Sequence, residues 1–137
     1  MGKLNLEVVT PEKVLVSSEA DMVVAPGTMG EFGILEGHVP FLSGILPGEL
    51  RFTIDGKTER FAVMDGFLEV SNDKVSVLVD AAESANDIDI ERARKAMERA
   101  RERLAKERGV EDVDFIRAEA ALKRAISRLK VAEKKSI

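Results

Sequence analysis

The chain has 137 residues and no cysteine, so disulfide bonds and thiolate metal sites are excluded. Hydrophobic residues make up 45% of it, which is enough for a buried core and argues against wholesale disorder. No apolar run approaches the roughly 18 residues that cross a bilayer, and no secretory signal is recognisable. We therefore expect a soluble, cytoplasmic protein with one domain, or one small domain and an appendage.

The net charge of −4 hides an asymmetry along the chain. Residues 1–83 contain 6 Lys and Arg against 14 Asp and Glu, whereas residues 84–137 contain 15 against 11. All 4 prolines and 9 of the 10 glycines also precede residue 84. This asymmetry predicts two units, 1–84 and 85–137, with different partners.

The first unit has the pattern of short strands. Apolar side chains alternate with others over residues 4–8, 50–54 and 75–79, as in half-buried strands. Valine- and phenylalanine-rich runs occupy residues 14–16, 22–25, 61–63 and 67–70. Asp55-Gly56 and Asn72-Asp73 are turn signals. The spacing predicts a β-sandwich of about ten antiparallel strands, or a barrel.

The second unit has a helical period. Steps of three and four residues join Ile90, Ala93, Met97, Ala100 and Leu104. Asp89 is placed to cap this helix, with Asp87 just outside it, and Gly109 should end it. Residues 111–114 should open a second helix with two heptad rows, Phe115-Leu122-Leu129 and Ala118-Ala125-Ala132. A short link between the helices predicts an antiparallel α-helical hairpin.

The seam of this hairpin is mostly alanine. Alanine lets helices approach closely but removes little apolar surface from water, at roughly 25 cal/mol per Å². Such a hairpin should open easily. The alternative is that alanine merely favours helix and the hairpin is a rigid handle. The pattern leaves both interpretations open.

Catalytic and metal chemistry have little support in the sequence. His38 is the one histidine, and no Ser-His-Asp spacing surrounds it. The glycine-rich segment 27–33 lacks the Lys-Ser/Thr of a P-loop, and no helical pattern follows it. We interpret it as a glycine-shaped loop between strands. We expect no enzyme activity in the isolated chain and no required metal.

The arginines of the hairpin suggest an anion site. Arg124 and Arg128 are four residues apart and share a helix face, as do Arg92 and Arg99, which are seven apart. Four guanidiniums near the first turn of a helix can bind a triphosphate. The alternative is a solvated surface. Nucleic acid is a weaker candidate, because a net +4 with 11 acidic residues is modest for a phosphate-backbone binder.

Several stretches resemble the epsilon subunits of bacterial F-type ATP synthases. They are residues 27–40, GTMGEFGILEGHVP, residues 47–50, PGEL, the opening 6–11, the strand 66–70, and the C-terminal 114–129. The likeness runs nearly end to end and in order. It implies a ten-stranded β-sandwich and a two-helix hairpin.

The resemblance also implies a place in the central stalk of a proton-translocating ATP synthase, peripheral to the cytoplasmic face of the cell membrane. The sandwich would bind the gamma subunit and the c-ring, with Glu31, Phe32 and His38 among the contacts. The hairpin would either fold against the sandwich or extend to the alpha/beta catalytic head and inhibit ATP hydrolysis. Neither nucleic-acid binding nor direct membrane insertion is implied. The rival hypothesis is a free-standing nucleotide-sensing or adaptor protein.

A sub-family motif points to ATP as a regulatory ligand. Residues 88–93, IDIERA, match the Ile/Leu-Asp-x-x-Arg-Ala motif of ATP-binding epsilon subunits. The resemblance then implies a site that comprises Glu83, Ile88, Asp89, Arg92, Ala93, Arg99, Arg124 and Arg128. ATP bound there would favour the folded hairpin.

Overall fold

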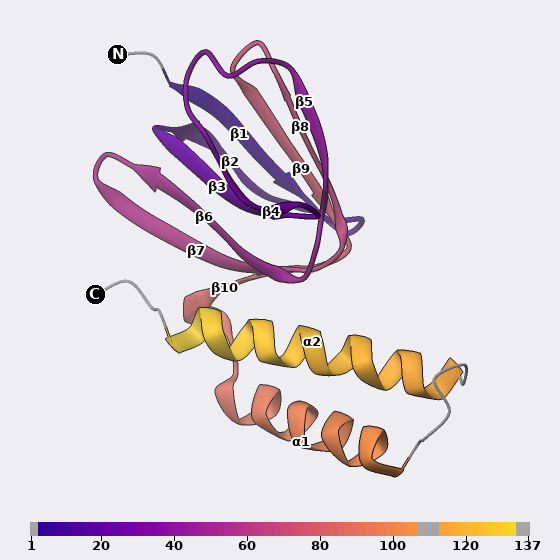
Figure 1. The fold of residues 1–137 in the computed structure, drawn as a ribbon. Helices are drawn as coiled ribbons and strands as arrows, with labels where there is room; N and C mark the ends of the chain where they lie inside the picture. The colour runs from indigo at the N-terminus through magenta and orange to yellow at the C-terminus, as the bar shows by residue number, and fades with distance from the viewer. Residues whose placement is uncertain (1–2, 107–112, 134–137) are drawn as a thin grey trace.

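The computed structural model describes residues 3–106 and 113–133. Ten strands come first, and a 3-10 turn and two helices follow (Figure 1). The strands are β1 (Leu4–Val9), β2 (Val14–Ala20), β3 (Met22–Gly27), β4 (Gly30–Ile34), β5 (Phe41–Ile45), β6 (Gly48–Ile54), β7 (Lys57–Val63), β8 (Gly66–Ser71), β9 (Lys74–Val79) and β10 (Ala82–Ser84). The turn η1 (Ala85–Asp87) leads to α1 (Ile90–Lys106) and α2 (Val113–Glu133). The predicted fold class is confirmed.

The strands are hydrogen-bonded in the order β10-β7-β6-β3-β5-β8-β9-β1-β2, with β4 paired to β3. The prediction of antiparallel strands is wrong for one pair, because β1 runs parallel to β9 from Asn5↔Lys74 to Val9↔Leu78. Parallel neighbours require a long crossover, and strands β2 to β8 supply it. The alternation of apolar residues shows which side of a strand each side chain is on. It does not show whether the neighbouring strand runs parallel or antiparallel.

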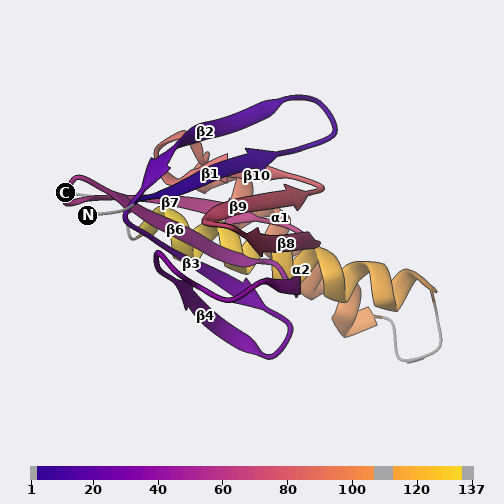
Figure 2. The ribbon, with the colours of Figure 1, turned by 90° about the horizontal axis from the view of Figure 1, so that it is seen from above.

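The core lies between the curved layers of the strands (Figure 2). The alternating positions that predicted the strands are the buried ones, Leu4, Leu6 and Val8 of β1 and Val75, Val77 and Val79 of β9. Across the two paired strands, Leu6 lies beside Val75 and Val8 beside Val77. Phe52 of β6 stacks on Phe61 of β7 with ring centroids 5.9 Å apart. Inward-pointing β-branched and aromatic side chains therefore fill the sandwich.

The predicted turns are confirmed, and one predicted loop is wrong. Asp55 and Gly56 have φ of 48° and 83°, and Asn72 and Asp73 have 49° and 60°, as type I′ hairpin turns require. The glycine-rich segment 27–33 is not a loop, because Gly30–Ile34 forms strand β4 against β3. Thr28 and Met29 alone make the turn. The strand was not predicted because Gly30 and Gly33 have no side chains that could show the alternation of a strand.

A charged cluster ties two turns to the start of the first strand. The Lys3 ammonium contacts Asp21 at 2.7 Å and Asp55 at 3.0 Å, and the Asp55 N–H donates to the Asp21 carboxylate at 2.9 Å. The hydrogen bond from Lys3 is the main reason that the pKa of Asp21 is lowered, and the same bond raises the pKa of Lys3. The cluster holds the start of β1 to the β2–β3 and β6–β7 connections.

The helical hairpin is confirmed with its alanine seam. Five alanines, Ala93, Ala100, Ala118, Ala125 and Ala132, are each less than 5% exposed, whereas the larger seam residues are half-buried. The predicted helix end at Gly109 and residues 111–112 lie outside the described residues. Of the helices that the structure describes, none has the length and apolar character needed to cross a membrane.

The hairpin rests on the sandwich through α2, which lies between the strands and α1 (Figure 1). A small apolar cluster forms this contact, and its members are Ala62 and Met64 of the sandwich, Ala85 and Ile88 of the link, and Val131 and Ala132 of α2. The sheet ends at Ser84, yet this cluster joins residues from both sides. The boundary at residue 84 stays a prediction.

Gly66 should be the least replaceable glycine of the sandwich. A Cβ at this position would lie 2.7 Å from the Val79 Cα in the neighbouring strand. Backbone cannot yield as a side chain does, so Gly66→Ala should destabilise the protein by roughly 2–3 kcal/mol, as overpacking does. The midpoint of urea unfolding measures this. In the control Gly33→Ala, the nearest atom is 3.9 Å away, and the midpoint should hardly change.

Candidate functional site

Two of the residues predicted to bind nucleotide, Glu83 and Arg128, lie at the junction between the sandwich and the hairpin. Glu83 of β10 and Arg128 of α2 form an ion pair, with the Arg128 Nε 3.5 Å from the Glu83 Oε1. Both line a cavity of about 240 Å³, together with Ala62, Met64, Ala81 and Ala82. Both side chains are between one third and one half exposed, so solvent screens the pair. A ligand can reach this pair.

Three further predicted residues serve the local structure. Asp89 caps α1: its carboxylate accepts a hydrogen bond from the Arg92 N–H at 3.1 Å, and its carbonyl accepts one from the Ala93 N–H at 3.0 Å. Ile88 is buried in the apolar cluster under α2, and Ala93 is buried in the hairpin seam. The motif at 88–93 therefore starts a helix and seats it.

The four predicted arginines do not surround one cavity. Arg92 and Arg99 are exposed on α1, and within the described ranges neither forms an ion pair. Arg124 lines a second, larger cavity on another side of α2, apart from the one that Arg128 lines. The structure thus brings together Glu83 and Arg128, whereas the other three arginines do not line the cavity of that pair.

Glu31, predicted as a partner contact, is held by an arginine. The Arg51 guanidinium binds both Glu31 carboxylate oxygens, at 2.8 and 3.0 Å. Arg51 also contacts Glu49 at 3.3 Å, and Arg60 contacts the same Glu49 oxygen at 2.8 Å. The hydrogen bond to Glu31 raises the pKa of Arg51. Alternating charges therefore form a row from β4 to β7, and two-pronged pairing fixes the Glu31 carboxylate.

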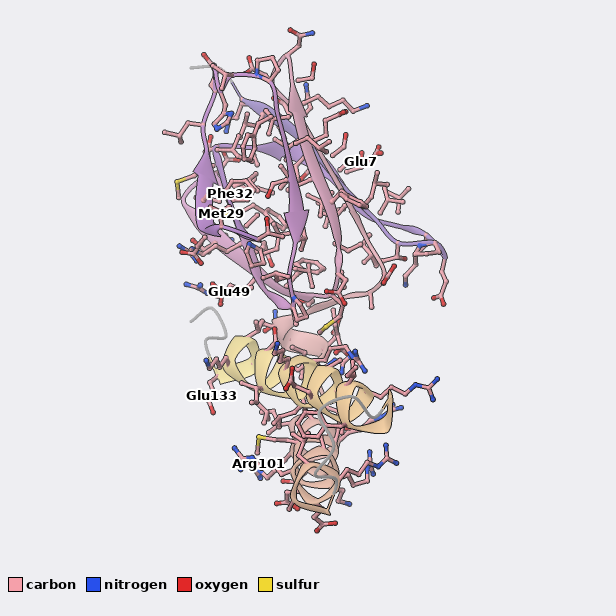
Figure 3. All side chains as sticks on the ribbon, turned by 45° about the vertical axis from the view of Figure 1, so that its right-hand side comes forward. Glu7, Met29, Phe32, Glu49, Arg101 and Glu133 are labelled. Carbon is pink, nitrogen blue, oxygen red and sulfur yellow. The ribbon has the colours of Figure 1, made fainter. Side chains whose placement is uncertain are left out.

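Phe32 and His38 gather around a third aromatic residue. The Phe41 ring packs edge-on against Phe32 at 5.2 Å and against His38 at 5.8 Å between centroids. The His38 Nδ1 lies 2.7 Å from the Val39 carbonyl oxygen. Figure 3 shows Phe32 beside the β3–β4 turn, where Met29 protrudes.

The predicted contact set is therefore divided. Glu31 and Phe32 are neighbours on a strand, so their side chains leave opposite faces of β4. Sequence reasoning missed Arg51 and Phe41, which hold these residues. The sequence signal for Arg51 was a positive charge at an outward-pointing position of β6, near the acidic Glu31. No local pattern marks Phe41.

An apolar face on the sheet was also missed. Leu42 of β5, Phe67 of β8 and Leu78 of β9 point outward, and each is more than half exposed. Phe67 pairs directly with Leu78, and Gly44 of β5 lies opposite Phe67. Exposed apolar side chains on one face of a sheet are typical of a protein contact surface. The signal was present as apolar residues on both faces of β5, β8 and β9.

The two structural units match two domains of one family. The beta-sandwich domain of the ATP synthase delta/epsilon chain matches residues 3–85, and the long alpha-helix domain of the same chain matches residues 86–133. The chain belongs to the ATP synthase delta/epsilon chain family. In the described residues, no group of three or more His, Cys, Asp and Glu is placed to hold a metal ion.

Relatives from bacteria agree with this assignment. The ATP synthase epsilon chain of Syntrophobacter fumaroxidans is 52% identical over 132 residues, which cover 96% of this chain and 97% of the relative. That of Carboxydothermus hydrogenoformans is 55% identical over 104 residues, or 76% and 78% of the two chains. The family member described here is thus similar to bacterial epsilon chains over nearly its whole length.

Solved structures agree in fold. A chain of the Euglena gracilis mitochondrial ATP synthase, in a structure of OSCP, F1 and c-ring, matches with a TM-score of 0.84 and 23% identity, covering 97% of this chain and 82% of that one. A chain of the Tetrahymena thermophila mitochondrial ATP synthase central stalk and c-ring matches with a TM-score of 0.57 and 17% identity, covering 97% and 96%.

The Asp89 cap should stabilise the hairpin independently of any ligand. Asp89→Ala removes the hydrogen bond to the Arg92 N–H, and loss of an N-cap costs about 1 kcal/mol. Circular dichroism should therefore record earlier thermal loss of helix. Asp87→Ala, two residues upstream in η1, is the matched control and should leave the transition in place. Equal shifts in the two variants would show that Asp89 acts only through its charge.

Proposed function

We propose that the protein is a non-catalytic rotor subunit that couples the catalytic head of a proton-translocating ATP synthase to its c-ring. Family membership supports this role. So does the apolar face of Leu42, Phe67 and Leu78, which fits a stable protein contact such as one with gamma. The ion-paired Glu31 and, separately, the aromatic cluster with Phe32 and His38 are the proposed contacts to gamma and the c-ring. The protein would then lie peripherally on the cytoplasmic face of the cell membrane.

The hairpin is proposed to act as a brake on ATP hydrolysis. The observation that carries this proposal is the small contact between α2 and the sandwich, in which Met64, Ile88 and Val131 are the largest side chains. Burial of such side chains contributes roughly 1.5–3 kcal/mol each, and ordering the hairpin offsets part of that gain. The folded state is thus within reach of opening. The basic hairpin, once extended, suits acidic surfaces of the catalytic head.

Deletion of residues 87–137 tests the brake. The truncated chain keeps all ten strands, so it should still co-purify with gamma and support ATP synthesis. ATP hydrolysis by the assembled complex should rise, because no helix is left to block it. Reversal of the charges of Arg117, Lys123 and Arg124 should raise hydrolysis in part. Unchanged hydrolysis after the deletion would refute the brake, and loss of gamma would refute the role of the sandwich.

ATP is proposed to clamp the folded hairpin. In the structure Arg128 already pairs with Glu83, so the phosphates would compete with this carboxylate or join the pair through a rearranged Arg128. Arg92, Arg99 and Arg124 would have to turn toward the same place, which their exposure or position at a cavity permits. Asp89 is excluded as a phosphate ligand because like charges repel. It can accept a hydrogen bond from the adenine amine.

The free energy that ATP binding can supply is large enough to shift the hairpin toward its folded state. A ligand that touches the sandwich side and both helices binds the folded state alone, and therefore favours it. At about 100 times its dissociation constant it contributes roughly 2.7 kcal/mol. A hairpin with an alanine seam and a six-residue contact to the sandwich can be switched by that amount. Falling ATP would then release the brake helices.

Calorimetric titration of the isolated protein with ATP tests the clamp. Arg92→Ala and Arg128→Ala should each weaken binding by more than about tenfold, as expected when a charged contact of at least 1.4 kcal/mol is lost. Arg101→Ala is the control, because Arg101 is exposed on α1, the helix farther from the sandwich (Figure 3). Binding of ATP by both variants at the parent affinity would return the arginines to a solvated surface.

A further inference from the structure

The larger cavity, which Arg124 lines, lies apart from the pair of Glu83 and Arg128. It is a groove of about 650 Å³ between α2 and the β5–β6 and β7–β8 connections. Pockets that bind small molecules usually measure about 300–1,000 Å³. The cavity of Glu83 and Arg128, at about 240 Å³, and one beside β1 and β2, at about 250 Å³, are smaller. We propose that the groove binds a small amphipathic monoanion, such as a medium-chain carboxylate.

The apolar part of the groove can hold a hydrocarbon body. Ala120 and Ser127 are seven residues apart, so they lie on one line along α2, and their small side chains leave the groove open. Ile116 on the α2 wall is 57% exposed, and Leu46 on the sandwich wall is 47% exposed. An apolar body between these two side chains would remove both from water.

The polar part of the groove is a row of three residues on α2. Arg124, Ser127 and Lys130 follow one another at steps of three, so they are neighbours across the helix surface, and all three line the groove. No ion pair among residues 3–106 and 113–133 includes Arg124 or Lys130. An anionic head group that lies on this row would contact a cation on each side.

The Ser127 hydroxyl is an independent indication of a ligand. Ser127 is 7% exposed, and its Oγ has no hydrogen-bond partner within the described ranges. Buried hydroxyls usually have a partner. A carboxylate between Arg124 and Lys130 would accept a hydrogen bond from this hydroxyl, because Ser127 is the middle residue of the row. The head group and the buried donor therefore meet at one place.

The carboxylates of the groove leave room for one negative charge. The Glu49 side chain is 10% exposed and is bound by two arginines of β6 and β7, at 3.3 and 2.8 Å. Glu119 contacts Lys123 at 3.7 Å. Asp65 is exposed, so solvent and salt screen its charge. Two cations thus remain against one screened carboxylate, and this balance suits a monoanion better than a ligand with several charges.

An occupant of the groove would favour the folded hairpin. The groove has one wall from α2 and one from the sandwich, so it exists only while the two are in contact. A ligand that binds only this state stabilises it. The inference does not rest on the proposed function, because both walls belong to this chain and Glu83 and Arg128 do not line the groove.

Calorimetric titration of the isolated full chain with octanoate tests the site, and 1-octanol is the neutral probe with the same number of carbons. Octanoate should bind at least about tenfold more tightly, because the alcohol lacks the charge that Arg124 and Lys130 would contact. Equal affinities for the two probes would overturn the proposal, as would the absence of octanoate binding.

Substitutions in the row test the head-group contact. Lys130→Gln should weaken octanoate binding by about tenfold, and Ser127→Ala by about threefold, while the affinity for 1-octanol stays unchanged. Arg101→Gln is the matched control, because it removes one positive charge from an exposed position of α1. Circular dichroism checks that each variant keeps its helices. Equal weakening by Lys130→Gln and Arg101→Gln would show that overall charge attracts octanoate, and it would overturn the proposal.

Amide resonances locate the bound octanoate. The amides of Gly48 and Ser127, one on each wall, should shift, whereas those of Phe67 and Leu78 on the outer face of the sheet should not. Shifts at Phe67 and Leu78 alone would assign octanoate to that face and overturn the proposal. Arg128→Ala should bind octanoate with the parent affinity even where it loses ATP, so failure of the ATP site and failure of this site are distinguishable.

Discussion

The architecture depends on one small contact, the apolar cluster through which Ile88 and Val131 reach Ala62 and Met64 of the sandwich. The sandwich has its own core of sixteen buried residues and does not need this contact to fold. The hairpin has only an alanine seam and a cap at Asp89. Its position relative to the sandwich is therefore decided largely at the cluster.

Each feature that surrounds the cluster acts on the same equilibrium. The ion pair between Glu83 and Arg128 lies on one side of α2, and the groove that Ser127 lines lies on another. The ion pair joins the last strand of the sandwich to α2, whereas the cavity separates α2 from two connections of the sandwich. A solvent-screened ion pair contributes about 0–1 kcal/mol by itself. The exposed ion pair therefore contributes too little to fix the hairpin alone.

Much of the fold could be predicted because alternation and turn chemistry are local. Leu4, Leu6 and Val8 indicated their strand and its buried face, and Asp55-Gly56 indicated its hairpin. The parallel pairing of β1 with β9 could not be predicted, since it is decided by which strands close the core around residues far apart in sequence. Strand β4 was hidden because Gly30 and Gly33 carry no side chains to alternate.

The candidate sites were less predictable, because they depend on where each side chain points as well as on its place in the sequence. Arg124 and Arg128 share a helix face by spacing, yet they line different cavities. Glu31 and Phe32 are adjacent in sequence but belong to different clusters, one organised by Arg51 and one by Phe41. A motif identifies which residues are available to a site. The packing of α2 on the sandwich determines which of them lie at a common cavity, as Glu83 and Arg128 do.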